Sequence, residues 1–233
     1  MKRSLPLLAV LTAVTLPLAA QEATQQAAQP IAIEPSSNVI FPMEVGIPGG
    51  EGTHYLAGMG IRTKTFLKVK VYAFGLYVDR QAAPAALADW QGRMWNDLQK
   101  DDSFYAALLE MSFPMTLRLV MTRNVGGEDM AEAFDGALTP RVQAVAAEMP
   151  GGEAAVQQFR TYFSVEEMTD GSELIFTCAD GTLSSSVKGE IMDDIESPAL
   201  CWALFDVYLG EDPVSKDGKK NAVQNFPNIL AGR

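Results

Sequence analysis

The sequence feature that most constrains the fold is the stretch of residues 58–79, GMGIRTKTFLKVKVYAFGLYVD. Successive side chains of a strand point to opposite faces, so the even-numbered positions from Lys68 onward share one face, which begins with lysines and becomes aromatic. This pattern predicts a long strand that leaves water and enters a core or cavity, with Arg62 just upstream pointing toward the same place. The alternative is an ordinary amphipathic strand with lysines at its solvent-exposed end and Arg62 in a surface turn.

Residues 1–20 have the pattern of a secretory signal peptide: basic Lys2 and Arg3, an apolar run over 5–18, and small residues at 19–20. The apolar run is too short and ends too abruptly for a membrane span, so no stable membrane insertion is expected. Residues 21–35 are rich in Gln, Ala and Pro and predict a flexible linker. Residues 36–233 then form one domain, and the expected location is periplasmic or secreted.

The charge balance argues against some classes of partner. The chain has 18 Lys and Arg against 29 Asp and Glu, a net charge of −11, which becomes −13 when Lys2 and Arg3 leave with the signal peptide. A domain this acidic is a poor candidate for binding nucleic acid or an anionic membrane surface.

Hydrophobic patterning predicts strands that run as hairpins and then clusters of helices. Residues 115–122 alternate cleanly as a strand, and Asp180-Gly181 between two apolar runs is typical of a type I′ hairpin turn. Helices are predicted over 81–91, 101–111 and 153–163, from Gly127 onward, and from Pro198, with Ser197 as its N-cap, to a stop at Gly210. Thr139-Pro140 predicts the start of a separate helix. The fold class expected from this order is α+β, a mostly antiparallel sheet covered by helices.

Several kinds of chemistry have no sequence support. His54 is the only histidine and is interpreted as a structural residue, so no metal site and no cofactor are expected. The motifs of nucleotide-binding loops, nucleophile elbows and zinc proteases do not occur. Cys178 and Cys201 are compatible with either a disulfide or two buried thiols.

Two segments resemble the chalcone isomerase-like family. Gly60-Ile61-Arg62 followed by KVYAFGLYVD at 70–79 is similar to the family's central strand pair. ALFDVYLG at 203–210, followed by DPVS at 212–215, is similar to a late helix of the family and the turn after it. The resemblance covers residues 39–230 and implies an open-faced β-sandwich, a large antiparallel sheet packed against a layer of helices, with a ligand cleft between them.

The resemblance also implies where a site would lie. Arg62 matches the family arginine that positions the substrate phenolate, and Tyr72 stands where the isomerases have threonine. The positions of the catalytic tyrosine, the catalytic asparagine and the substrate-selecting hydroxyl fall on Met130, Ala137 and Val207. These side chains neither donate nor accept a proton, and a lost oxyanion donor costs about 3–4 kcal/mol. No catalytic residues are therefore expected.

The function expected from these substitutions is non-catalytic binding of a fatty acid or similar hydrophobic carboxylate. Arg62 is expected to hold the carboxylate, with the Tyr72 hydroxyl as a second donor. The expected ligand-binding residues are Arg62, Tyr72, Phe74, Met130, Phe134, Ala137, Val207 and Tyr208.

Two other interpretations stay open. One is an isomerase acting on an unsaturated phenol or acid, with Tyr72, Tyr208 or His54 handling the proton. The other is a partner-binding exported protein without an open cleft, in which a carboxylate such as Asp206 neutralises the buried Arg62. The sequence does not indicate an oligomeric state.

Overall fold

The computed structural model describes residues 29–64 and 67–233, so the predicted signal peptide lies outside the described residues. Its centre is an eight-stranded sheet with the order β11-β10-β9-β6-β5-β4-β3, in which β12 also pairs with β10. Every pairing in this sheet is antiparallel. The strands are β3 Glu44–Gly46, β4 Thr53–Lys64, β5 Val69–Val78, β6 Met115–Met121, β9 Glu173–Ala179, β10 Thr182–Val187, β11 Glu190–Ile191 and β12 Ile195–Glu196.

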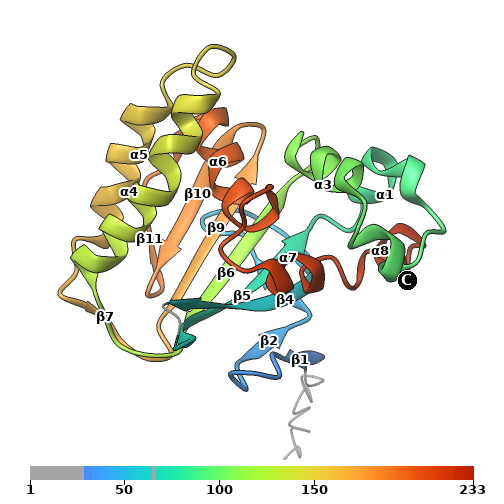
Figure 1. Ribbon diagram of the computed structural model, residues 1–233, viewed down its shortest axis with the longest axis horizontal. Helices are drawn as coiled ribbons and strands as arrows, with labels where there is room; N and C mark the ends of the chain where they lie inside the picture. Colours follow the sequence, from blue (N-terminus) through green and yellow to red (C-terminus); the bar gives the residue numbers. More distant parts are fainter. Residues whose placement is uncertain (1–28, 65–66) are drawn as a thin grey trace, which may run out of the picture.

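Helices form a layer against this sheet, which confirms the α+β architecture (Figure 1). α4 and α5 lie together at one end of the layer, α6 lies in the middle, and α1, α3 and α8 lie at the other end. The helices are α1 Ala83–Ala86, α2 Trp95–Leu98, α3 Asp102–Leu109, α4 Gly127–Ala144, α5 Gly152–Arg160, α6 Pro198–Leu209, α7 Lys216–Asn221 and α8 Phe226–Leu230. Within the described part of the chain, no helix has both the length and the apolar character needed to cross a bilayer.

The stretch 58–79 forms the end of β4 and all of β5. The sequence predicted Arg62 just upstream of a long strand. In the structure Arg62 lies within β4, which continues to Lys64, and it is directly opposite Tyr72. Two glycines of β4 allow α7 to approach closely. A Cβ on Gly58 would lie 2.0 Å from the Asn221 carbonyl oxygen, and one on Gly60 would lie 2.6 Å from the Cα of Gly218.

Helix α4 differs from the sequence prediction, because it does not restart at Thr139. It runs unbroken from Gly127 to Ala144 with Pro140 inside. Proline in a helix interior removes one backbone hydrogen bond. Leu138 and Val142, on either side of Pro140, are buried, so core packing offsets this cost and keeps the helix continuous.

Helix α6 begins and ends as predicted. The Ser197 hydroxyl accepts a hydrogen bond from the Leu200 amide, and the helix ends before Gly210. A disulfide between Cys178 of β9 and Cys201 joins this helix to the sheet, which decides between the two alternatives left open by the sequence. The hairpin β9–β10 is also confirmed, with the positive φ angles at Asp180 and Gly181 that a type I′ turn requires.

The sheet face opposite the helices is covered in part by a two-stranded ribbon, β1 Ile31–Ile33 and β2 Ile40–Pro42. Phe41 of this ribbon is buried in a second, smaller core with Tyr77 and Val120. Part of the predicted linker is therefore a strand, because the ribbon covers apolar side chains that would otherwise face water. Two short strands, β7 Val125–Gly126 and β8 Glu167–Met168, pair beside the start of α4.

Candidate functional site

A cavity of about 250 Å³ lies between the β4–β5 pair and the start of α4. Arg62 and Val71 line it from the strands, and Met130 lines it from the helix. Its complete lining is Arg62, Lys64, Val71, Arg123, Asn124, Val125, Gly126, Asp129, Met130 and Ala133. The cavity thus combines three cations and one carboxylate with apolar walls, a composition suited to a small organic anion.

Arg62 is held by a chain of hydroxyl groups that leads into the core. Its Nη1 donates to the Tyr72 hydroxyl at 3.2 Å, and its guanidinium carbon lies 5.4 Å from the centre of the Tyr72 ring. The Tyr72 hydroxyl is in turn 2.8 Å from the Tyr208 hydroxyl. The adjacent Tyr72 raises the pKa of Arg62, and burial raises the pKa of Tyr208. The group therefore consists of one fixed cation and two tyrosine hydroxyls connected by hydrogen bonds.

The alternative interpretation, in which Asp206 neutralises Arg62, is wrong in its choice of partner. Asp206 instead accepts a hydrogen bond from Arg141 Nε at 2.7 Å, within an ion pair between α6 and α4. Among residues 29–64 and 67–233, Arg62 forms no ion pair with a carboxylate. A half-buried guanidinium without a counter-charge retains its capacity to bind an anion.

Other predicted site residues lie beside this chain or deeper in the core. The Phe74 ring lies 4.8 Å from the Tyr208 ring. Phe134 stacks on Phe163 at 5.1 Å, within an aromatic cluster that includes Phe159. The structure thus brings Arg62, Tyr72, Tyr208 and Phe74 together and places Met130 at the cavity, whereas Phe134 packs in the closed core.

Ala137 and Val207, the remaining predicted residues, contribute backbone contacts. The Ala137 carbonyl accepts a hydrogen bond from Arg141 Nη1 at 2.8 Å. The Val207 carbonyl accepts one from the Val214 amide at 2.9 Å. Val207 is buried and Ala137 is half-buried against the core. Neither residue lines the cavity of Arg62.

Sequence reasoning missed two cations of the cavity, Lys64 and Arg123. Both are exposed and line the cavity with Arg62. Lys64 follows Arg62 by two residues, so strand alternation places both on one face. Arg123 follows β6 closely, but its approach to β4 depends on a fold that the local sequence does not describe.

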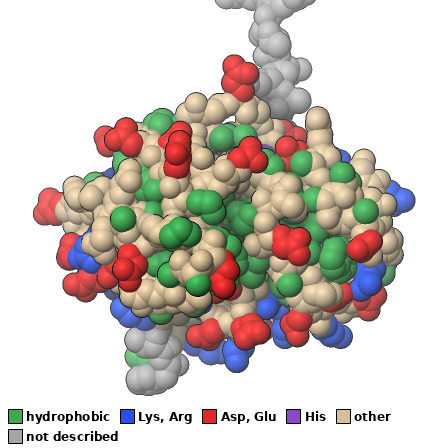
Figure 2. Space-filling model, turned by 90° about the horizontal axis from the view of Figure 1, so that it is seen from above, with side chains coloured by type: hydrophobic (Ala, Val, Ile, Leu, Met, Phe, Trp, Pro, Cys, Tyr) green, Lys and Arg blue, Asp and Glu red, His purple; other side chains and the backbone are tan. Residues whose placement is uncertain are grey.

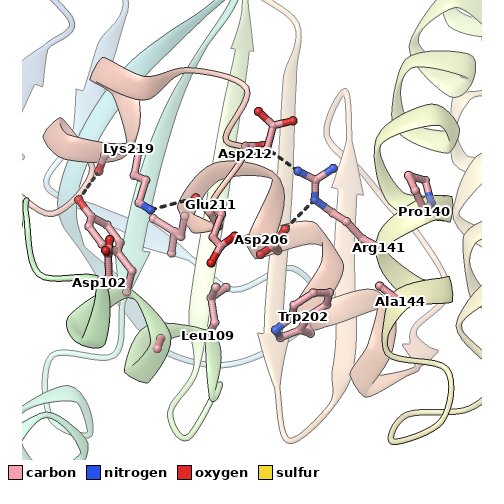
Figure 3. Close-up of a pocket in the computed structure, with 14 residues that line it drawn as sticks. Asp102, Leu109, Pro140, Arg141, Ala144, Trp202, Asp206, Glu211, Asp212 and Lys219 are labelled. Carbon is pink, nitrogen blue, oxygen red and sulfur yellow. Dashed lines mark hydrogen bonds and ion pairs between the residues drawn. The ribbon is translucent and has the colours of Figure 1, made fainter.

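A larger groove of about 900 Å³ lies between α3, α4, α6 and the turn after α6 (Figure 3). Its two cations already have partners. Arg141 donates to Asp206 and to the Asp212 carbonyl, and Lys219 Nζ donates to the Gly210 carbonyl at 2.9 Å. Burial lowers the pKa of Lys219. These contacts tie α4 and α7 to the end of α6, so we interpret the charged groups of the groove as structural.

His54 is buried and serves a structural purpose. Its Nδ1 lies 2.8 Å from the Thr116 hydroxyl, which lies 2.6 Å from the Thr177 hydroxyl, so the three side chains connect β4, β6 and β9. Desolvation lowers the pKa of His54, while the carboxylate of Asp79 raises it by a smaller amount. In the part of the chain that the structure describes, no cluster of three or more His, Cys, Asp or Glu side chains is arranged to hold a metal.

The sequence is similar to known proteins of a single family. Residues 52–223 match the family model described as chalcone isomerase like. The chain belongs to this family. Chalcone–flavanone isomerase of Zea mays is 28% identical over 205 residues, which span 84% of this chain and 89% of the relative. Fatty-acid-binding protein 1 of Arabidopsis thaliana is 25% identical over 204 residues, which span 84% of this chain and 71% of the relative.

The fold of this family member also matches a solved structure. The crystal structure of an Arabidopsis thaliana fatty-acid binding protein, AtFAP1, superposes with a TM-score of 0.73 at 23% identity, covering 87% of this chain and 100% of the other. The chalcone isomerase-like architecture expected from the sequence is therefore confirmed. The family contains both isomerases and fatty-acid-binding proteins, so membership alone does not separate catalysis from binding.

Proposed function

We propose that this protein binds a fatty acid or a similar hydrophobic carboxylate beside Arg62 and releases it unchanged. The observation that carries the proposal is a half-buried guanidinium at the wall of a partly apolar cavity. Two tyrosines lie behind it, and it forms an ion pair with none of the described carboxylates. The fatty-acid-binding relatives support the same ligand class.

The carboxylate is expected to accept hydrogen bonds from Arg62. Lys64 and Arg123 add positive potential at the mouth of the cavity. A hydrogen bond to a charged group contributes about 1.5–3 kcal/mol. The apolar part of the ligand then contacts Met130 and Val71, and each buried methylene contributes about 0.8 kcal/mol.

Binding to purified protein tests this proposal directly. Native mass spectrometry of the untreated chain without residues 1–20, the mature form proposed here, should reveal a co-purified small molecule. A fluorescent fatty acid should bind, and Arg62→Ala should weaken its binding by roughly ten- to hundredfold, the equivalent of about 1.5–3 kcal/mol.

Arg80→Ala is the matched control for this substitution. Arg80 also lies over a tyrosine ring, that of Tyr55 at 4.5 Å, but lines a different depression from Arg62. Arg80→Ala should leave binding unchanged. Equal binding by wild type and Arg62→Ala, together with empty protein in native mass spectra, would rule out the proposed site.

Isomerase activity is the second candidate, and the Arg62–Tyr72 hydrogen bond is the observation that favours it. A guanidinium beside a hydroxyl can position a phenolate and donate to a developing enolate. Met130, Ala137 and Val207 supply no further donor from their side chains. Incubation with chalcones, followed by absorbance, should show no ring closure above the uncatalysed rate, and a rate that depends on Tyr72 would favour the isomerase instead.

A further inference from the structure

Six basic side chains gather where β4 and β5 are connected, and we call this region the basic end. Three line the cavity of Arg62, and three line a depression of about 510 Å³ on the other side of the same strands. The six are Arg62, Lys64, Arg123, Lys68, Lys70 and Lys216. Three carboxylates share these linings, those of Asp129, Glu34 and Asp217. The basic end therefore carries positive charge in a chain whose net charge is −11.

One of the three carboxylates is already occupied by local contacts. Glu34 is buried, and its Oε2 accepts hydrogen bonds from the Ser37 amide at 2.7 Å and from the Ser37 hydroxyl at 2.6 Å. Lys64, Lys68, Lys70, Arg123 and Lys216 are all exposed. Lys70 Nζ also donates to the Ser36 carbonyl. The charges of the other four residues face solvent, where a partner can reach them.

An apolar side chain lies among these lysines. Leu67 precedes Lys68 at the start of β5 and is 70% exposed, the highest value among the large apolar side chains that the structure describes. A single exposed leucine is ordinary on a protein surface. Its position between Lys64 and Lys68 matters here, because apolar side chains framed by lysines suit the boundary between lipid headgroups and acyl chains.

The net charge of the chain does not prevent this end from approaching an anionic surface. At physiological ionic strength charges are screened over about 8 Å, so carboxylates elsewhere on the molecule contribute little at the basic end. Figure 2 shows Lys and Arg side chains at the left, lower and right margins of the view, whereas Asp and Glu side chains are spread across it. For the approach to an anionic surface, the charge at the basic end therefore matters more than the net charge of the chain.

We propose that the basic end docks reversibly on a lipid bilayer with anionic headgroups, with Leu67 entering the headgroup region. Lys68, Lys70 and Lys216 contact the headgroups on one side of the strands, and Lys64 and Arg123 contact them on the other. The cavity of Arg62 opens at this same end. A hydrophobic anion can then pass between bilayer and protein along a short path.

Vesicle co-sedimentation tests this docking on the chain without residues 1–20. We expect binding to vesicles that mix phosphatidylcholine and phosphatidylglycerol, weak binding to phosphatidylcholine alone, and release by high salt. Each basic residue near an anionic leaflet contributes about fivefold in partitioning. Lys70→Glu combined with Lys216→Glu should therefore reduce partitioning by about 25-fold or more.

Matched controls distinguish an effect of where the substituted residues lie from an effect of the change in net charge. Lys100→Glu with Arg233→Glu makes the same change in net charge, and these residues adjoin α3 and α8, away from the β4–β5 connection in Figure 1. This variant should still bind. Leu67→Gln should weaken partitioning severalfold, whereas Met94→Gln, at a side chain that is 66% exposed on another surface, should not.

Three results would overturn the docking proposal. The first is equal binding to both kinds of vesicle, and the second is an equal loss of vesicle binding in the basic-end and control variants. The third is binding of a short DNA duplex that depends on the basic-end lysines, without any binding to vesicles. The test is independent of the proposed ligand. Vesicle binding by a protein that binds no fatty acid would contradict the proposed function and leave the docking intact. Fatty-acid binding by a protein that does not bind vesicles would contradict only the docking.

Discussion

Tyr72 on β5 and Tyr208 on α6 share a hydrogen bond of 2.8 Å between their hydroxyl groups, although 136 residues separate them in the sequence. Both side chains are buried, and Tyr72 also accepts a hydrogen bond from Arg62. The sheet and the helix layer are therefore joined directly behind the proposed anion-binding guanidinium. This arrangement restrains Arg62 before any ligand arrives, which lowers the entropic cost of binding.

Removal of one hydroxyl from this pair should reduce both stability and affinity. Tyr208→Phe leaves the buried Tyr72 hydroxyl with Arg62 alone, so we expect a loss of about 1–2 kcal/mol in the free energy of unfolding. Fatty-acid affinity should fall severalfold because Arg62 is less restrained. Urea denaturation of Tyr72→Phe, Tyr208→Phe and the double variant measures the coupling, which should exceed about 0.5 kcal/mol. Strictly additive losses would argue against a functional pair.

The size of the cavity should limit ligand length. At about 250 Å³ it is smaller than the roughly 300–1,000 Å³ usual for drug-sized ligands. Medium-chain carboxylates should therefore bind without rearrangement, whereas longer chains must displace Met130 or its neighbours. Met130→Ala should strengthen long-chain binding relative to medium-chain binding, as measured by displacement of a fluorescent fatty acid across a chain-length series. An unchanged preference in Met130→Ala would place the tail elsewhere.

The disulfide between Cys178 and Cys201 should make stability sensitive to reductant. It closes a loop with a sequence separation of 23, for which the loss of unfolded-state entropy corresponds to about 3 kcal/mol. Addition of dithiothreitol under denaturing conditions should lower the free energy of unfolding by about this amount. The Cys178→Ala, Cys201→Ala double variant should be insensitive to reductant. A wild-type transition that reductant does not shift would mean that the disulfide contributes little.

His54 should make the fold less stable in mild acid. Burial lowers its folded-state pKa below the ordinary value of 6.5. As the pH falls through about 6.5, the unfolded chain takes up a proton that the folded chain does not, so the free energy of unfolding decreases. The stabilisation is complete above this range and is lost progressively below it.

Comparison with His54→Gln isolates this effect from the titration of carboxylates. The difference in free energy of unfolding between wild type and His54→Gln should shrink between about pH 7.5 and 5.5, because glutamine does not titrate. Chemical denaturation at several pH values measures this difference. A constant difference across the range would show that His54 is protonated equally in both states.

Features set by neighbouring residues were predictable from the sequence. The Asp180-Gly181 hairpin, the Ser197 cap and the alternation of β6 depend on local backbone preferences and side-chain periodicity. The two segments of family resemblance predicted the remaining architecture, and both Arg62 and Met130 line the cavity. The strand β1 and the unbroken α4 were missed, because burial against distant residues overrode local signals at residues 31–33 and at Pro140.

The sequence by itself determined most of the strands and helices and the Ser197 cap, since each depends on residues a few positions apart, and its resemblance to a family identified the candidate arginine. Only the tertiary structure decided that Cys178 bonds to Cys201, that Asp206 pairs with Arg141 and not with Arg62, and that Lys64 and Arg123 join Arg62 around one cavity. These relationships depend on distances between side chains that are remote in the chain, and such distances are set by the packing of helices on the sheet.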